Sequence, residues 1–230
     1  MAFAWPAPRI EPLGECALLL GFGDTMDNAV NDRVHAAAHA LRAAHLPGVR
    51  DIAPAYATLA LYYDPGTWQG DTDGFSPWQR LADAALQIAS GAGRDTSERA
   101  GVVDIPVHYG GVQGPDLSAV AKHAGLDAAE VVARHLAGEY RVAMIGFAPG
   151  FAYLSGLDPA LACPRRETPR VRVPAGSVAI GGPQTGIYPS ELPGGWQIIG
   201  CTSIALFDAA REPPSLLTAG DRVRFSSIDS

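Results

Sequence analysis

The chain has 230 residues, of which 47% are hydrophobic and 18% charged, and its formal net charge is −7. This length can bury a substantial core in one or two domains. The acidic balance argues against nucleic acid as a partner, because nucleic-acid binders need a basic footprint. No apolar run approaches the roughly 18 residues that a membrane span requires, so we expect no membrane partner.

The cysteines and the N-terminal segment bear on compartment and metal content. Cys16, Cys163 and Cys201 are far apart and lack the Cys/His spacing of structural zinc, so we expect no metal site. A few scattered thiols suit a reducing compartment. A signal peptide has a basic region followed by an apolar region, and the first residues show no such pattern. We therefore expect a cytoplasmic protein.

The first part of the chain predicts a small α/β domain. In chain order we expect a strand at 16–22, a helix at 30–41, strands at 49–54 and 58–63, and a helix that begins after Ser76. This order favours a small sheet with helices on one side. The small, polar stretch 90–101 is the expected boundary. It gives an N-terminal domain over 1–92 and a C-terminal domain over 99–230.

The second part becomes rich in short strands. We expect a strand at 102–107, helices at 116–123 and 127–136, a strong strand at 140–147, and short strands at 178–180, 197–199, 203–207 and 222–225. Many short strands joined by Gly/Pro turns indicate a barrel or a sandwich.

The segment 146–200 is dense in Gly and Pro and also carries large aromatic residues. Pro149 followed by Gly150 fits a type II turn, in which Gly takes a positive φ. Phe147, Phe151 and Tyr153 surround this turn. They form either the walls of a pocket or part of the barrel core, and the sequence leaves both open.

A cluster of arginines follows in the same segment, at Arg165, Arg166, Arg170 and Arg172. Guanidinium groups bind carboxylate or phosphate bidentately, so the cluster is a candidate anion site; a solvated rim or salt bridges to another polypeptide are the alternative. Neighbouring prolines keep the chain extended, which places Arg166, Thr168, Arg170 and Arg172 on one face.

The sequence gives only weak signals for other binding or catalytic sites. The glycine-rich loops at 174–177 and 181–186 could offer backbone N–H groups to an oxyanion, but no P-loop motif is present. His135 falls on the apolar face of its expected helix, which favours a core histidine over a catalytic base. No carboxylate pair stands out for acid–base work. The pattern indicates a binding surface more clearly than a catalytic centre.

Longer motifs resemble a known family. GFAPGFAYLSGL at 146–157 and PRRETPRVRVPAGSVAIGGPQTGIYPSELPGGWQIIGCT at 164–202 resemble the B subunits of bacterial 5-oxoprolinases, also called the allophanate hydrolase subunit 1 or KipI family. Their modules also occur as carboxyltransferase subdomains C and D. IPVHYGG at 105–111 and GPDL at 114–117 extend the resemblance over nearly the whole chain.

The resemblance implies an α+β fold with a small N-terminal α/β (ferredoxin-like) domain and a C-terminal cyclophilin-like β-barrel. It implies a component of an ATP-dependent lactam hydrolase that is inactive alone. Together with the A and C subunits of 5-oxoprolinase, such a protein cleaves 5-oxo-L-proline to L-glutamate. ATP would be shared with these partners, with no metal or biotin on this chain. An isolated chain could self-associate through the surface meant for the C subunit.

The family motifs assign a substrate-binding pocket and leave the catalytic residues unknown. The pocket residues are Phe147, Pro149, Phe151, Tyr153, Arg170, Pro174, Gly176, Gln184, Tyr188 and Trp196. Two positions depart from the family pattern, since Ser190 and Cys201 stand where a larger apolar residue and an Arg are expected. If that Arg binds an anion, its absence puts the substrate in doubt.

Relatives imply two other functions. One is a carboxyltransferase component acting on urea or allophanate, and the other is an inhibitor of a histidine kinase. Prolyl isomerase activity is less favoured, because a fold does not carry a function.

Overall fold

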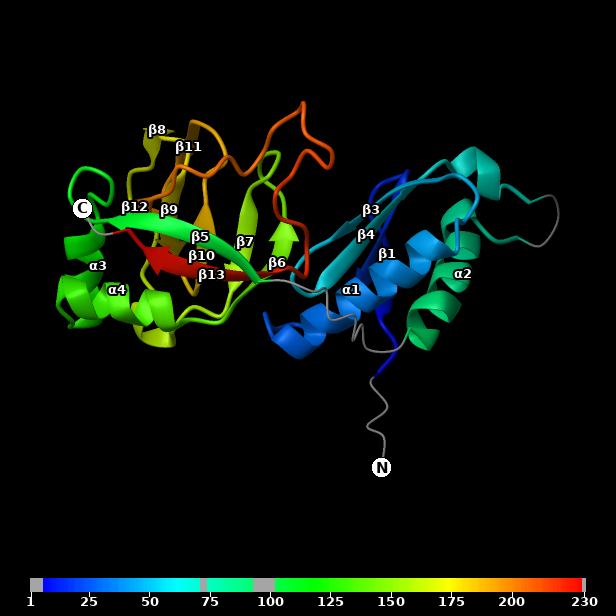
Figure 1. The fold of residues 1–230 in the computed structure, drawn as a ribbon. Helices are drawn as coiled ribbons and strands as arrows, with labels where there is room; N and C mark the ends of the chain where they lie inside the picture. Colours follow the sequence, from blue (N-terminus) through cyan, green and yellow to red (C-terminus); the bar gives the residue numbers. More distant parts are fainter. Residues whose placement is uncertain (1–5, 71–73, 93–101, 229–230) are drawn as a thin grey trace. The chain divides into compact units, whose positions relative to one another are not determined.

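A computed structural model describes residues 6–70, 74–92 and 102–228. The chain divides into two compact units, Met1–Glu98 and Arg99–Ser230 (Figure 1). Of the boundary expected at 90–101, residues 93–101 lie outside the described residues. Within the described ranges, every helix is too short or too polar to cross a bilayer.

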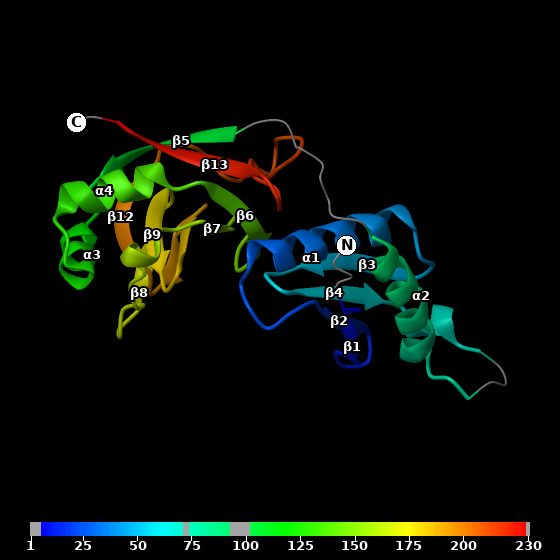
Figure 2. The same cartoon turned by 90° about the horizontal axis from the view of Figure 1, so that it is seen from below.

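The N-terminal unit is a four-stranded antiparallel sheet with two helices on one face (Figure 2). Its elements are β1 (Arg9–Pro12), β2 (Ala17–Gly21), α1 (Asn28–Ala43), β3 (Val49–Pro54), β4 (Thr58–Tyr63), the 3₁₀ turn η1 (Pro65–Trp68) and α2 (Pro77–Gly91). The sheet order is β1-β2-β4-β3. The expected order of strand, helix, two strands and helix is confirmed from β2 to α2, and β1 is an additional strand.

Local sequence explains these elements. Apolar residues recur at helical spacing in α1, so that Val34 and Leu41 are buried against the sheet residues Leu59 and Leu61. The expected start of α2 is confirmed, because the side-chain oxygen of Gln79 accepts a hydrogen bond from the backbone N–H of Ser76 at 2.8 Å.

The ferredoxin-like assignment of this unit is not confirmed. A ferredoxin-like chain runs β-α-β-β-α-β and ends on a strand after its second helix. Here the edge position beside β2 is held by β1, which precedes β2 in the chain. The first strand described after α2 is β5, which belongs to the other unit.

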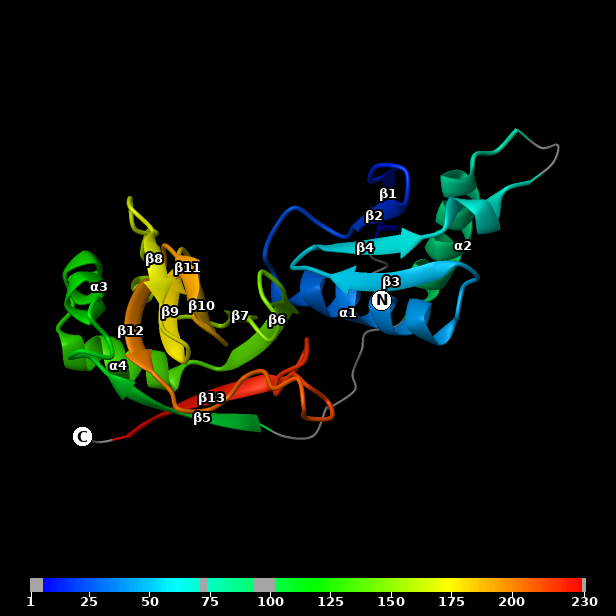
Figure 3. The same ribbon diagram turned by 90° about the horizontal axis from the view of Figure 1, so that it is seen from above.

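The C-terminal unit is a closed seven-stranded barrel in the order β10-β7-β6-β13-β5-β12-β9. The barrel strands are β5 (Val102–Tyr109), β6 (Tyr140–Ile145), β7 (Ala152–Ser155), β9 (Ser177–Gly181), β10 (Gln184–Ile187), β12 (Gln197–Cys201) and β13 (Arg222–Ser227). β5 and β13 run side by side and parallel, whereas the other pairs are antiparallel (Figure 3). This closed barrel agrees with the expected cyclophilin-like class.

Two helices and a small second sheet complete the unit. They are α3 (Leu117–Ala124), α4 (Ala128–Ala137), the 3₁₀ turn η2 (Pro159–Leu161), and the two-stranded sheet of β8 (Arg170–Val173) and β11 (Leu192–Gly194). Both helices contribute to the main core: Val120 of α3 and Val131 of α4 are fully buried with the barrel interior.

The strand expected at 203–207 is wrong. This segment has no strand and makes one isolated bridge, from Phe207 to Ser215. Its apolar character has another cause, because Leu206 is buried in the barrel core and Ile204 packs against it.

Candidate functional site

The turn between β6 and β7 holds an aromatic residue in a strained conformation. Phe147 has a φ of +71°, and the N–H of Ala148 donates to the carbonyl of Gly146 at 2.8 Å. A hydrogen bond from residue i+2 back to i around a positive φ defines the rare, strained form of the γ-turn. Such strain concentrates at functional sites. The side chain is 61% exposed, so burial of this ring does not explain the strain.

The next turn positions the neighbouring strand. The N–H of Phe151 donates to the carbonyl of Ala148 at 3.0 Å, and Gly150 between them has a φ of +81°. These features confirm the type II turn expected at Pro149-Gly150. The two consecutive turns direct the rings of Phe147 and Phe151 toward each other.

Four aromatic residues then pack around Phe151. The ring of Phe151 lies 5.4 Å from Phe147, 4.8 Å from Tyr153, 5.2 Å from Tyr188 and 5.7 Å from Trp196, measured between ring centroids. Most of these pairs are edge-to-face, which is the favoured arrangement of aromatic rings. Phe151 and Trp196 are buried, so the cluster is a fixed wall.

This wall borders a cavity of about 260 Å³. The lining residues are Phe147, Phe151, Tyr153, Arg165, Pro169, Tyr188, Pro193, Gly194, Gly195 and Trp196. Among the described residues, no Asp or Glu contributes to this lining. We call this space the aromatic cavity.

Arg165 provides the charge in the aromatic cavity. Its guanidinium carbon lies 5.7 Å from the centroid of the Trp196 ring, a cation–π geometry. Burial raises the pKa of Tyr153, and the positive charge of Arg165 acts in the opposite direction. Burial also raises the pKa of Tyr188. The hydrogen bond from the backbone N–H of Trp196 and the charge of Arg165 lower it, but by less. Both phenols therefore stay neutral near pH 7.

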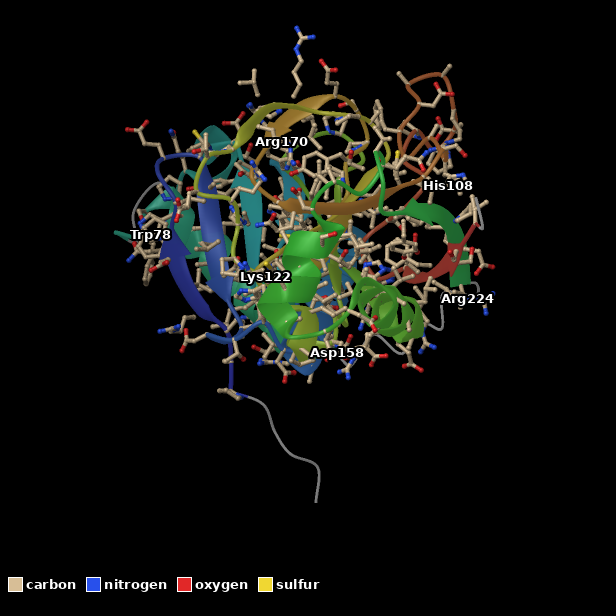
Figure 4. The ribbon with its side chains drawn as sticks, turned by 90° about the vertical axis from the view of Figure 1, so that its left-hand side faces the viewer. Trp78, His108, Lys122, Asp158, Arg170 and Arg224 are labelled. Atoms are coloured by element: carbon tan, nitrogen blue, oxygen red, sulfur yellow. The ribbon has the colours of Figure 1, made fainter. Side chains whose placement is uncertain are left out.

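Arg170, by contrast, is bound to a buried carboxylate. Its Nη1 and Nη2 donate to the two oxygens of Asp116 at 2.8 and 2.9 Å. Nη1 of Arg166 reaches the same group at 3.2 Å, and the N–H of Ile198 donates to it at 2.7 Å. Burial favours a higher pKa for Asp116, but the hydrogen bonds from Arg170 and Ile198 hold it below the usual range. Figure 4 labels Arg170, the first residue of β8, in the upper part of the view and Arg224 of β13 toward its right-hand side.

Of the ten expected pocket residues, five line the aromatic cavity and five lie elsewhere. The structure brings together Phe147, Phe151, Tyr153, Tyr188 and Trp196 around the aromatic cavity. Pro149 and Pro174 are exposed turn residues, Gln184 begins β10, and Gly176 is buried in a backbone contact. Arg170, Pro149, Pro174, Gly176 and Gln184 do not line the cavity. The role of each residue in binding substrate remains a prediction.

Three amides of the two glycine-rich loops form internal hydrogen bonds, which argues against these three groups as binding sites for an oxyanion. The N–H of Gly176 donates to the carbonyl of Tyr188 at 2.7 Å, and that of Ser177 to Pro174. The N–H of Gly182 donates to Cys163 at 2.8 Å. These amides already form β-type and turn hydrogen bonds.

His135 is a core histidine, as expected. It is fully buried, with Nδ1 2.8 Å from the hydroxyl of Tyr109 and Nε2 3.1 Å from that of Thr185. Since the Thr185 hydroxyl donates to the carbonyl of Ala179, Nε2 carries the proton and Nδ1 accepts from Tyr109. Burial lowers the pKa of His135 to about 3. It is neutral at pH 7 and has no access to substrate.

Sequence reasoning missed Asp116, and it included Arg165 in the candidate anion cluster but assigned Arg170 to the pocket, whereas Arg165 lines the cavity. Asp116 marks the start of a helix in the sequence pattern, and Arg165 is one of four similar arginines. The remaining acidic and thiol groups of the described ranges form no cluster of three that could hold a metal ion.

Comparison with known proteins assigns this fold and site to a family. A family model described as the carboxyltransferase domain, subdomain C and D, matches residues 8–217, so the chain belongs to this family. The chain is 43% identical over 226 residues to the B subunit of the 5-oxoprolinase of Bacillus subtilis (strain 168), covering 96% of this chain and 92% of that protein. It is 58% identical over 123 residues to the corresponding protein of Escherichia coli O157:H7, covering 54% and 56%.

Solved structures extend the comparison. The protein TTHA0988 superposes with a TM-score of 0.79 at 41% identity over 93% of this chain, which spans 40% of that longer chain. A conserved uncharacterized protein from Pyrococcus horikoshii is 39% identical, with a TM-score of 0.56 and coverage of 96% and 98%. The urea amidolyase of Kluyveromyces lactis shares the fold, with a TM-score of 0.78 at 18% identity over 99% of this chain and 15% of its own.

Proposed function

We propose that this chain acts as the B subunit of an ATP-dependent 5-oxoprolinase, which cleaves 5-oxo-L-proline to L-glutamate together with the A and C subunits. The observation that carries the proposal is the 43% identity across 92% of a known B subunit of 5-oxoprolinase. The aromatic cavity supports it, because its volume of about 260 Å³ lies below the roughly 300–1,000 Å³ that drug-sized ligands occupy. A compact ring such as a five-membered lactam suits that size.

The lining of the aromatic cavity supports a role that depends on partners. Amide hydrolysis needs a nucleophile or a general base near the carbonyl carbon. Among the described residues, the polar side-chain groups of the lining are the Arg165 guanidinium, the Trp196 indole N–H and two tyrosine hydroxyls, and burial keeps both phenols protonated at neutral pH. These groups can bind and orient an amide and exclude water from it. Proton transfer would then come from a partner protein, so the chain alone should be inactive.

ATP is expected to bind mainly to the partner proteins. Opening an unstrained lactam requires coupling to ATP hydrolysis. The amides of Gly176, Ser177 and Gly182 in the two glycine-rich loops form backbone hydrogen bonds, and no P-loop motif occurs in the sequence. The proposed reaction draws on ATP and produces glutamate, so we place it in the cytoplasm.

Reconstitution tests the proposal. This chain is purified with the A and C subunits and supplied with 5-oxo-L-proline and ATP, and glutamate release is measured. We expect glutamate only when all three proteins and ATP are present. The proposal fails if the full set releases no more glutamate than the mixture without ATP.

A conservative variant connects the activity to the aromatic cavity. Tyr153→Phe removes one hydroxyl from the lining, and we expect a fall in kcat/KM of the assembled enzyme of about 5- to 10-fold, the effect of one lost hydrogen bond. Tyr62→Phe makes the same change at an exposed tyrosine of the N-terminal unit and should leave kcat/KM unchanged. If the two variants change kcat/KM equally, the cavity does not take part in the reaction.

A further inference from the structure

Arg165 is the arginine of the cluster whose charge is free to meet a ligand. It is exposed, and within the described ranges it forms no ion pair and no hydrogen bond. Its guanidinium lies over the face of the Trp196 ring. An aromatic ring under one face of a guanidinium leaves the N–H edge available, and this edge binds a carboxylate with two parallel hydrogen bonds.

The neighbouring arginines are already engaged. Arg170 donates both terminal nitrogens to Asp116, and Arg166 donates one. Arg172 lies 3.6 Å from the carboxylate of Glu191 on the exposed β8–β11 sheet. One buried carboxylate thus faces two guanidinium groups, and no acid of the described ranges lines the aromatic cavity. The electrostatic balance at the cavity is positive, which favours an anion.

Apart from the hydroxyls of Tyr153 and Tyr188, most of the remaining lining surface is apolar. Phe147, Phe151 and Trp196 present rings to the cavity, and Pro169 and Pro193 add aliphatic surface. Such walls pack against a small planar or puckered ring and offer it few hydrogen bonds. The strained φ of Phe147 holds an exposed ring at the rim, where it can cover a bound molecule.

We infer that the aromatic cavity binds small molecules in which a compact ring carries a carboxylate, with Arg165 as the binding residue for the carboxylate. The inference deepens the proposed function and rests on it, because 5-oxo-L-proline has both parts. Arg165, rather than Arg170, is then the charged residue that selects the substrate. Trp196 acts as a positioning residue that holds the guanidinium in place.

Kinetics of the assembled enzyme test this role. Arg165→Gln removes the charge, and Arg172→Gln removes a charge from the same segment outside the cavity. We expect Arg165→Gln to raise KM for 5-oxo-L-proline by about 10- to 100-fold, the range for one charged hydrogen-bond partner, with a smaller change in kcat. Arg165→Lys should recover part of the loss. Arg172→Gln should stay within about 2-fold of the wild type in KM, because an exposed pair contributes little.

A neutral analogue shows whether the carboxylate is the group recognised. Inhibition by 5-oxo-L-prolinamide, which lacks the negative charge, is compared with binding of 5-oxo-L-proline. The wild type should prefer the acid by about 10-fold or more, the effect of one charged hydrogen-bond partner, and Arg165→Gln should lose this preference. The inference is overturned if Arg165→Gln and Arg172→Gln have the same KM, or if the preference for the acid survives in Arg165→Gln.

Two further outcomes are decisive. If Arg165→Gln fails to co-purify with the partner proteins while Arg172→Gln assembles, then Arg165 pairs with a partner acid and the inference is wrong. If the wild-type assembly releases no glutamate, the proposed function fails, and this failure is separate from the inference about Arg165.

In that case, equilibrium dialysis with 5-oxo-L-proline, L-proline and 2-furoate tests the inference. If the wild type retains any of these three compounds and Arg165→Gln does not, the inference is supported. If the two proteins do not differ, the inference is overturned.

Discussion

Asp116 and Arg170 form a bidentate ion pair, with donor–acceptor distances of 2.8 and 2.9 Å, between the start of α3 and the first residue of β8. Asp116 is 5% exposed and also accepts the N–H of Ile198 in β12. One carboxylate therefore joins a helix, a barrel strand and the small second sheet. It also fixes the segment that precedes Arg170, in which Arg165 lies.

Asp116→Asn should destabilise the protein strongly. The amide loses the charge that Arg170 and Arg166 require, and breaking a buried pair in this way costs about 3–5 kcal/mol. We expect a value near the lower end of that range, since Arg170 keeps some contact with water. Urea unfolding measures this. Asp104→Asn, which breaks the exposed pair with Arg224, is the control and should change the midpoint little. Similar effects of both variants would contradict the assigned role of Asp116.

His135 should make stability depend on pH. Burial lowers its folded-state pKa to about 3, below the unfolded value of 6.5. The stabilisation is complete above about pH 6.5 and is lost as pH falls toward 3, because the unfolded chain binds a proton that the folded barrel excludes. The slope approaches about 1.4 kcal/mol per pH unit. Unfolding free energies between about pH 7 and pH 4 should show a shallower slope in His135→Gln.

The matched control for this prediction is His123→Gln, which changes a histidine of α3 that lies outside the buried core. It should retain the wild-type slope. If His135→Gln also retains that slope, proton exclusion by the barrel core is not its source.

The strain at Phe147 predicts an unusual order of stabilities. A residue with a Cβ at a φ of +71° costs about 1–2 kcal/mol, and Gly avoids this cost. Phe147→Gly should therefore be more stable than Phe147→Ala by about 1 kcal/mol, which thermal unfolding can resolve. Both variants lack the ring and should reduce glutamate release by the assembled enzyme to a similar extent. If Phe147→Ala is the more stable variant, the turn is not strained.

Gly176 has a steric role that a matched glycine can isolate. A Cβ at Gly176 would clash with the carbonyl oxygen of Thr202, whereas one at Gly182 would meet nothing within 4 Å. Both residues have positive φ angles, of +79° and +63°. Gly182→Ala should cost about 1–2 kcal/mol. Gly176→Ala should cost about 1–3 kcal/mol more, the typical cost of overpacking. Equal unfolding midpoints would contradict the contact.

Local patterns predicted most of the regular elements. The runs at 49–54 and 58–63 appear as β3 and β4 with the same bounds, because each alternates or concentrates apolar residues between clear turns. β1 was missed because Ile10 is its one partly buried residue, so an edge strand leaves almost no apolar pattern. β7, β8, β10 and β11 have three or four residues each, too short for a period to emerge.

The aromatic part of the site was predictable and the charged part was not. Residues Phe147, Phe151 and Tyr153 follow a readable turn, and the structure places all three around one cavity. Which arginine faces that cavity depends on where Asp116 lies, and Asp116 is 50 and 54 residues away in sequence from the arginines that it binds. No spacing rule reaches across such a distance.

The parallel pairing of β5 with β13 affects the order in which the molecule can be built. Residues 102–107 pair with residues 222–227. The barrel therefore cannot close until the later segment has left the ribosome. Until then one edge of β5 is exposed and able to pair with another chain. Contacts of such sequence separation also form slowly. Newly made protein is therefore most prone to aggregate in the interval before β13 arrives, and a partner that binds early would shorten it.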